Sequence, residues 1–311
     1  MADEDRWSAL AAAVVGPGVS VVRGADVGAL TTLRVGGPAA VLATVEDEEA
    51  LRRAVLAARD LDLPVLVVGR GSNLLLSDEG WPGLVLRLGR GFRGLTISGP
   101  EVVAGGAEPM PSVAVRTAQA GLAGFAWGAA VPGSMGGGVR MNAGAHGEDM
   151  AAGLVVARVL DATTGAVEDW DLPRLGLGYR TSALGPEHVV MSVRLRLRED
   201  DRDAVLAEID AIRAWRREHQ PLDRPSCGSV FTNPPGASAG RLIEEAGLKG
   251  VRIGGAEVST THANFIVTSP GALASDVAEL IDLVIVRVRE ASGVELRPEV
   301  VRAAPPSRGQ G

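Results

Sequence analysis

Apolar and polar residues alternate most regularly within residues 188–198, and this pattern predicts an antiparallel strand. Met191, Val193 and Leu195 are apolar there, whereas the residues between them are serine or arginine. Such alternation is typical of a strand with one buried face and one face in water. Shorter apolar runs predict further strands at residues 39–45, 63–68, 95–103 (two short strands about a turn), 154–160, 166–171 and 263–267, and around residue 253.

Apolar residues at helical spacing predict helices between these strands. The expected helices are residues 7–15, 46–60, 111–120, 202–218, 238–246 and 275–292. The helix at 46–60 has acidic residues in its first turn and arginines later, which suits the helix dipole. With the strands at 39–45 and 63–68 it forms a βαβ unit. The last helix is expected to have Ser275 as its N-cap and to end at Gly293, and residues 226–233 are expected to form a loop.

Glycine is concentrated in two segments. Residues 124–147 read GFAWGAAVPGSMGGGVRMNAGAHG, and residues 65–76 read VLVVGRGSNLLL. Glycine permits a positive φ or a close approach of the backbone, and successive free N–H groups in such a turn can bind a pyrophosphate. One such segment alone is more often a structural loop. Two of them, without the spacing of a Rossmann fingerprint or a P-loop, fit an extended dinucleotide better than a nucleoside triphosphate.

Composition narrows the class of protein. The chain has 311 residues, of which 46% are hydrophobic, so it is long enough for two or three globular domains. The formal net charge is −7 and the sequence has no basic stretch with interleaved aromatic residues, which argues against a nucleic-acid partner. The N-terminal residues are acidic and no apolar run has membrane-spanning length, so a cytoplasmic protein without membrane contact is expected.

Few other side chains suggest chemistry by themselves. Arg180 lies in a GYRTS segment and Ser229 in an SCGSVF segment. Taken alone, an arginine is more often a surface ion-pair partner, and a serine in a turn is more often structural. Cys227 is the only cysteine, so no internal disulfide can form, and it is expected to be a small packed residue. The four histidines lack the spacing of metal ligands, so no metal site is expected.

Eight segments taken together are far more specific than any one of them. In chain order they are TTLRVGGPA, VVGRGSNLLLSD, PGSMGGGVRMNAGAHG, GYRTS, QPLDRPSCGSVFTNP, AGRLIEEAGLKG, STTHANFIV and ELRPEVVR. In this order, over about residues 31–302, they closely resemble the UDP-N-acetylenolpyruvoylglucosamine reductases, also called UDP-N-acetylmuramate dehydrogenases, of peptidoglycan precursor synthesis.

The resemblance implies an α+β fold. It consists of an FAD-binding domain of the vanillyl-alcohol-oxidase type, with two α+β subdomains, followed by a smaller α+β substrate-binding domain. The expected division is an N-terminal segment (1–30), the FAD-binding domain (31–200), a linking helix (201–218), the substrate-binding domain (219–302) and a disordered tail (303–311). The short spacing between Arg180 and Ser229 resembles the subclass that lacks a tyrosine-bearing loop. The oligomeric state is left open, with a monomer as the default expectation.

The resemblance also implies the cofactors and the residues that hold them. NADPH is the expected reductant, and FAD is expected to be noncovalent because Ser72-Asn73 stands where covalent members of the wider fold have a tethering histidine. The expected FAD-binding residues are Arg34, Gly69, Arg70, Gly71, Ser72, Asn73, Pro132, Gly133, Ser134, Gly137, Asn142, Ala143 and Gly144.

The implied substrate is a UDP-sugar enolpyruvate. The residues expected to bind it are Tyr179, Asn233, Lys249 and His262. Three positions depart from the usual pattern of the family, where a charged residue is common: Thr232, Thr261 and His219. Which residues replace those contacts to the substrate diphosphate is left open.

Arg180, Ser229 and Glu299 fall on the family's three catalytic positions. The implied reaction adds a hydride from reduced FAD to the enolpyruvyl ether, after which Ser229 gives a proton to Cα. Arg180 and a protonated Glu299 would stabilise the enolate. A flavin oxidase acting on an alcohol or sugar is the alternative enzyme, but it would need a histidine or tyrosine base and commonly a covalent flavin. A catalytically idle flavin-binding protein is the other alternative, and it would not need these three side chains.

Overall fold

The computed structural model describes residues 3–304, and these residues divide into two compact units. Unit 1 is made from residues 3–25, Ala39–Arg70 and Pro82–Ala214, and unit 2 from Asp26–Pro38, Gly71–Trp81 and residues 215–304. Each unit therefore gathers segments that are distant in sequence. The domain boundaries expected from the sequence stay a prediction, because compactness does not show which segments bind cofactor or substrate.

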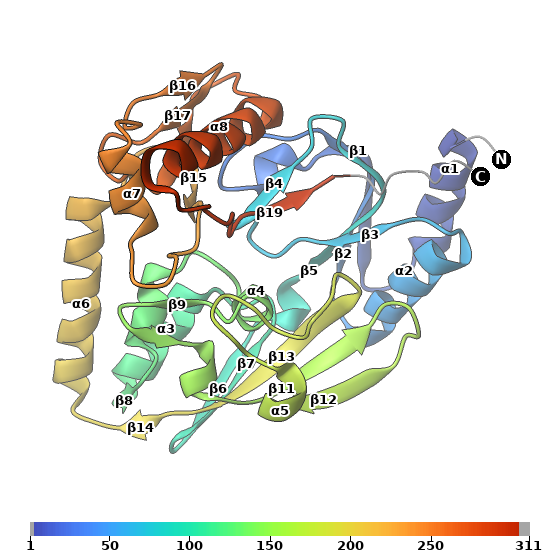
Figure 1. Ribbon diagram of the computed structural model, residues 1–311. Coiled ribbons are helices and arrows are strands. Elements are labelled where there is room, and N and C mark those ends of the chain that lie inside the picture. The colour runs from blue at the N-terminus through green and yellow to red at the C-terminus, as the bar shows by residue number, and fades with distance from the viewer. Residues whose placement is uncertain (1–2, 305–311) are drawn as a thin grey trace. The chain divides into compact units, whose positions relative to one another are not determined.

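The first sheet of unit 1 carries the predicted βαβ unit. Its strands, in spatial order, are β1 (Val19–Asp26), β2 (Pro38–Val45), β5 (Trp81–Leu88) and β3 (Val65–Val67). β3 runs parallel to β5, which separates it from β2. Helices α1 (Asp3–Val14) and α2 (Glu48–Asp60) cover the sheet (Figure 1). The shared core includes Leu10, Leu51 and Leu84. Asp47 begins α2 by accepting a hydrogen bond from the Ala50 amide at 2.8 Å, which confirms the predicted helix.

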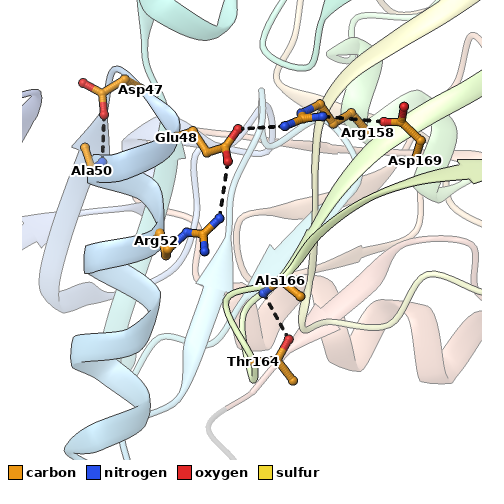
Figure 2. A network of polar contacts seen from close by, with 8 residues as sticks. All are labelled: Asp47, Glu48, Ala50, Arg52, Arg158, Thr164, Ala166 and Asp169. Atoms are coloured by element: carbon orange, nitrogen blue, oxygen red, sulfur yellow. Dashed lines mark hydrogen bonds and ion pairs between the residues drawn. The ribbon is translucent and has the colours of Figure 1, made fainter.

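Charged side chains join α2 to the neighbouring strands of the same unit. Figure 2 shows Glu48 between two arginines: its carboxylate lies 3.4 Å from Arg52 and 3.2 Å from Arg158. Arg158 also lies 3.9 Å from Asp169 on the adjacent strand. Exposed pairs of this kind contribute little stability singly, so this network mainly fixes which surfaces face each other.

The second sheet of unit 1 is antiparallel and has its own core. Its order is β12 (Val167–Asp171), β11 (Leu154–Asp161), β13 (His188–Arg196), β7 (Glu101–Gly105) and β6 (Leu95–Ser98) (Figure 1). On β13, Val193 and Leu195 are buried and Arg194 and Arg196 are exposed, which confirms the predicted half-buried strand. Helices α3 (Met110–Gln119) and α6 (Arg202–His219) supply further residues of this core. The two sheets, each packed against helices, confirm the α+β class, and Val189 and Met191 of β13 extend into the core of the first sheet.

Short elements complete unit 1. They are β8 (Leu122–Ala123), β9 (Gly144–Ala145), β10 (Glu148–Asp149), β14 (Arg198–Glu199), α4 (Met135–Arg140), α5 (Leu172–Leu175), η2 (Arg90–Phe92), η3 (Ala126–Ala130) and η4 (Met150–Ala152).

Unit 2 is built on a four-stranded sheet. Its order is β15 (Ser226–Ser229), β18 (Phe265–Thr268), β17 (Ala256–Val258) and β16 (Arg252–Ile253). Helices α7 (Ala239–Glu245) and α8 (Ala274–Ser292) belong to the same core, beside the turn η1 (Gly28–Leu30) and the parallel pair β4 (Leu74–Leu76) and β19 (Val301–Ala303). The prediction of a loop at residues 226–233 is therefore wrong for residues 226–229, which form β15 and pair with β18.

The C-terminal strand also corrects the expected tail. Ala303 was expected to begin it, but this residue ends β19, where it pairs with Leu76 in the register of the two strands. The rest of the predicted tail, residues 305–311, lies outside the described residues. No helix within residues 3–304 combines the length and the apolar character needed to cross a lipid bilayer.

The start of α8 differs from the prediction. Leu273, and not Ser275, is the N-cap residue. Asp78 supplies the missing acceptors, because its carboxylate binds the Ala274 amide at 2.7 Å and the Ser275 amide at 2.9 Å. Burial alone would raise the pKa of Asp78, but the hydrogen bonds from these two amides outweigh it and lower the pKa. A local sequence pattern cannot reveal this cap, because its donor and acceptor are almost 200 residues apart.

Candidate functional site

The two glycine-rich segments meet inside unit 1. Arg70 donates from Nε to the carbonyl oxygen of Pro132 at 2.7 Å. A Cβ atom on Gly69 would lie 2.6 Å from the Ser134 hydroxyl oxygen, so a side chain there would displace this hydroxyl from its present position. The sequence predicted both segments as parts of one FAD site, and the structure does bring Gly69 and Arg70 next to Pro132 and Ser134.

The triple glycine does not form the expected open turn. Gly136, Gly137 and Gly138 lie in α4, which begins at Ser134, whose hydroxyl accepts from the Gly137 amide at 3.3 Å. The Gly138 amide is bound to the Ser134 carbonyl at 2.8 Å, so this N–H is used within the helix. A Cβ on Gly138 would come within 2.8 Å of Met110. Close helix packing explains this glycine better than anion binding does.

Arg180 is held against the second glycine-rich segment. Its backbone is in the left-handed region, with φ of 58°. The guanidinium donates to the Gly144 carbonyl at 2.6 Å and to the Asn142 carbonyl at 3.5 Å, and it lies 5.2 Å from the centre of the Tyr179 ring. Two predicted FAD-binding residues therefore orient the predicted catalytic arginine.

The side chain of Asn142 is buried and forms hydrogen bonds only with other protein groups in the structure described for residues 3–304. It is 2% exposed and has a positive φ of 39°. Its amide nitrogen donates to Asp149 at 3.0 Å and to the Gly178 carbonyl at 2.9 Å, while its oxygen accepts from the Ala151 amide at 3.0 Å. The amide is thus satisfied by protein partners, and the residue's part in the site is to shape the backbone that contacts Arg180.

The first glycine-rich segment continues in unit 2, where it contacts the C-terminal segment. Gly71 has φ of 60°, and a Cβ there would lie 2.6 Å from the Leu30 carbonyl oxygen. The Asn73 side chain donates to the Glu299 carbonyl at 3.1 Å, and the Asn73 carbonyl accepts from the Val301 amide at 3.1 Å. Asn73, predicted to bind FAD, therefore positions the carbonyl of the predicted catalytic glutamate and the start of the strand that follows it.

Ser229 is exposed at the end of β15, and a buried asparagine fixes the residues that follow it. Asn264, 4% exposed, accepts from the Phe231 amide at 2.9 Å and donates to the Phe231 carbonyl at 2.8 Å. Its own carbonyl accepts from the Val230 amide at 2.8 Å. The Val230 carbonyl in turn binds the Glu299 amide at 2.7 Å. Ser229 and Glu299 are therefore brought to neighbouring segments of one ladder.

Cys227 is packed behind this ladder. It is a free thiol, 5% exposed, as predicted. Burial raises the pKa of the thiol to about 12, and the negative charge of Glu299 acts in the same direction. The thiol is therefore protonated and unreactive at neutral pH.

The residues expected to bind the substrate gather partly in unit 2. Lys249 lies 2.7 Å from Glu244, and the Asn233 side chain accepts from the Ala239 amide at 3.0 Å at the start of α7. Burial lowers the pKa of the half-buried His262, and the charge of Lys249 adds to this effect, so the ring is neutral at pH 7. Tyr179 lies in unit 1 and is 58% exposed.

The positions that depart from the family pattern have protein partners of their own. The Thr232 hydroxyl donates to the Arg297 carbonyl at 3.3 Å, and the Thr261 amide donates to the Ser259 hydroxyl at 3.1 Å. His219 stacks on Trp215 and is close enough to His262 to lower its pKa slightly. Of the three, only His219 can still carry a positive charge near the predicted substrate residues.

The remaining residues expected to bind FAD lie in the two glycine-rich segments or, in the case of Arg34, beside a cavity. A Cβ on Gly69 or Gly71 would meet the Ser134 hydroxyl or the Leu30 carbonyl, so these glycines let the first glycine-rich turn pack closely against neighbouring segments. Arg34 is exposed, with φ of 54°, and lines a cavity of about 380 Å³ in unit 2. Ser72, Gly133 and Ala143 lie within the segments already described. Among residues 3–304 no group of three or more His, Cys, Asp or Glu side chains is arranged to hold a metal ion.

The three predicted catalytic residues belong to different units. Arg180 lies in unit 1, whereas Ser229 and Glu299 lie in unit 2. Sequence reasoning missed Asn264, although it lies in the STTHANFIV segment used for the resemblance. Its hydrogen bonds to Phe231 span more than thirty residues, and no local pattern marks them.

Comparison with known proteins gives a consistent result over most of the chain. Residues 220–303 match the family described as UDP-N-acetylenolpyruvoylglucosamine reductase, C-terminal domain, and residues 38–169 match the family described as FAD binding domain. The UDP-N-acetylenolpyruvoylglucosamine reductase of Bacillus velezensis is 42% identical over 87% of this chain and 89% of its own length. A second reductase of this name, from Symbiobacterium thermophilum, is 44% identical over 87% of this chain and 88% of its own.

A solved structure agrees with these relatives. The crystal structure of UDP-N-acetylenolpyruvylglucosamine reductase from Thermus caldophilus superimposes with a TM-score of 0.79 at 40% identity. The match covers 91% of this chain and 98% of that one.

Proposed function

The chain belongs to the UDP-N-acetylenolpyruvoylglucosamine reductase family, and from that premise we propose that Arg180, Ser229 and Glu299 are its catalytic residues. The protein is an FAD-dependent oxidoreductase that uses NADPH to reduce UDP-N-acetylglucosamine enolpyruvate to UDP-N-acetylmuramate, a step of peptidoglycan precursor synthesis.

One observation carries the assignment of Arg180. Two carbonyl groups of the glycine-rich segment 132–144 fix its guanidinium, and they do so at 2.6 and 3.5 Å. An arginine stays protonated at physiological pH, so these contacts hold a cation beside the predicted FAD-binding segment. FAD, when bound, supplies the hydride chemistry of the reaction.

The remaining steps fall to side chains of this chain. Addition of hydride to the terminal carbon of the enolpyruvyl group places negative charge on Cα, which is delocalised into the attached carboxylate as an enediolate, and this dianion needs a nearby cation. Arg180 stabilises it by charge, and Glu299 in its protonated form donates a hydrogen bond to it. Ser229 donates the proton that completes the product at Cα. A hydroxyl is a weak acid, but its partner here is a strongly basic enolate.

Binding of the UDP-sugar falls to a second group of residues. We assign Lys249 to the diphosphate, with His219 as an additional charge when it is protonated. His262, neutral at pH 7, is suited to hydrogen bonding with the substrate and not to charge neutralisation. Asn233 and Tyr179 complete the group of substrate-binding residues.

The setting of the enzyme follows from its substrates. NADPH and nucleotide sugars are metabolites of the cytoplasm, and we place the enzyme there. We also expect a monomer, to be checked by light scattering after size-exclusion chromatography. A dimer at micromolar concentration would contradict that expectation.

The role of Ser229 is tested by separating the two half-reactions in a stopped-flow spectrometer. Ser229→Ala should leave reduction of the flavin by NADPH nearly unchanged, because no substrate carbon is protonated in that step. Reoxidation by the enolpyruvyl substrate should slow by at least the roughly 10²–10⁴-fold typical of one acid–base group. Ser229→Cys should recover part of the rate, since a thiol can donate from nearly the same position. Equal, modest losses in both half-reactions would mean that Ser229 only shapes the turn.

A further inference from the structure

Arg70, Arg87 and Arg93 are arginines of unit 1 that lie near one another and have no carboxylate partner within residues 3–304. Among residues 3–304, Arg70, Arg87 and Arg93 form no ion pair, and the side chains of Arg87 and Arg93 donate no hydrogen bond either. Arg70 uses only its Nε, toward the Pro132 carbonyl. Other arginines of this unit, such as Arg90 and Arg116, also form no ion pair within residues 3–304, but they are exposed to water, whereas the guanidinium of Arg87 is half-buried. Three unpaired guanidinium groups in one region therefore need an explanation.

The parallel strands β3 and β5 bring Arg87 beside the first glycine-rich segment. Val67 lies opposite Leu86 in the register, and the Val68 amide donates to the Leu86 carbonyl at 2.9 Å. The chain then continues from β3 into Gly69, at the same edge of the sheet as Arg87. Leu86 packs in the core of the first sheet, so Arg87, the next residue, points to the opposite face. Carboxyl ends of parallel strands are a common place for ligands.

The three charges act on one another. Arg87 is half-buried, and this burial lowers its pKa; the charges of Arg93 and Arg70 lower it further. An arginine nevertheless stays protonated at physiological pH. The region is thus an uncompensated positive site that a bound anion would stabilise. A half-buried cation without an anionic partner is otherwise unfavourable.

We propose that Arg87, together with Arg70 and Arg93, binds the diphosphate of FAD. The proposal rests on the FAD dependence stated above and adds the side chains of Arg87 and Arg93 to that of Arg70, which the first glycine-rich segment already contributes. A diphosphate carries two adjacent negative charges, and guanidinium groups match phosphate oxygens in charge and geometry. The 2′-phosphate of NADPH has similar chemistry, but Arg70 belongs to the glycine-rich segment itself, which favours the diphosphate of FAD.

The test measures release of FAD from the holoenzyme. Arg87→Gln and Arg87→Lys are compared with wild type, and Arg90→Gln is the matched control, because Arg90 is exposed in the same connection. The dissociation constant is obtained from free-flavin fluorescence on dilution, at low and at high salt. Arg87→Gln should weaken FAD binding by roughly 10- to 100-fold at low salt, as for loss of a charge-assisted hydrogen bond. The FAD dissociation constant of Arg87→Gln should also change less between low and high salt than that of wild type. The FAD affinity of Arg87→Lys should lie between those of wild type and Arg87→Gln, and the affinity of Arg90→Gln should match that of wild type.

A second measurement separates binding from folding. The thermal midpoint is followed over a titration with FAD. The deficit of Arg87→Gln relative to wild type should be absent without FAD and grow as FAD is added, whereas a purely structural arginine would lower the midpoint by the same amount at every FAD concentration, zero included. Unchanged FAD affinity, or unchanged salt dependence, would overturn the proposal. So would a variant that binds FAD normally but loses its preference for NADPH over NADH, because the anion would then be the 2′-phosphate. Failure of the wild-type protein to bind FAD would instead contradict the cofactor assignment.

Discussion

Replacement of Asn264 by alanine tests how the fold holds the segment that follows Ser229. The side chain of Asn264 forms two hydrogen bonds, at 2.9 and 2.8 Å, with the amide and the carbonyl of Phe231. Asn264 and Phe231 are 4% and 2% exposed, so water cannot replace the lost partner. Each buried backbone group left without a partner costs about 1–3 kcal/mol. With two such groups, the expected loss in the free energy of unfolding of unit 2 is about 2–6 kcal/mol.

The thiol of Cys227 provides a local assay for this change. It lies on β15, next to the same segment, and its burial keeps it protonated and protected from alkylating reagents. Alkylation of the native protein should be slow in wild type and much faster in Asn264→Ala, because it requires β15 to open. Hydrogen exchange at the Phe231 and Val230 amides should accelerate in parallel.

The control is Thr232→Ala, which removes one exposed hydrogen bond of 3.3 Å to the Arg297 carbonyl. This change should alter stability by no more than about 0.5 kcal/mol. Reoxidation of the flavin by substrate should slow in Asn264→Ala, while reduction by NADPH should not. An Asn264→Ala protein with the stability and the thiol protection of wild type would refute the argument that Asn264 holds this segment.

Three further predictions follow from the described contacts. Arg180→Lys should keep the fold and the bound FAD but lose most turnover, because lysine lacks the planar fork that spans two carbonyls; an unchanged turnover number would remove Arg180 from the site. Acid precipitation should release FAD into a yellow supernatant, whereas colour retained in the pellet would show a covalent flavin. The pKa of the buried Glu257 is lowered, first by its hydrogen bond from Arg224 at 2.7 Å and also by Arg252, while burial acts in the opposite direction. The contribution of Glu257 to the free energy of unfolding should be complete above the ordinary glutamate pKa of 4.5 and be lost as pH falls below it. Unfolding measured from pH 7 to pH 3 should show a smaller acid-induced loss of stability in Arg224→Met than in wild type.

The sequence alone determined most secondary-structure elements and the identity of the family. Alternation on β13 and helical spacing in α2 report burial of one face, which is a local property, and both predictions are confirmed. The ordered motifs sufficed for the family because they record side chains that chemistry requires, such as Arg180 and Ser229, whatever their distance in space. The buried state of Cys227 was also predictable from residue type.

Only the tertiary structure decided which partner each polar group has. Asp78 replaced Ser275 at the start of α8, Asn73 proved to hold the backbone of Glu299, and Gly138 proved to be required by contact with Met110. In each case the two partners are close in space but distant in sequence. Periodicity and turn propensity describe interactions within a few residues along the chain. A hydrogen bond or a steric contact between distant segments depends on how the whole unit folds, and so no local pattern can specify it.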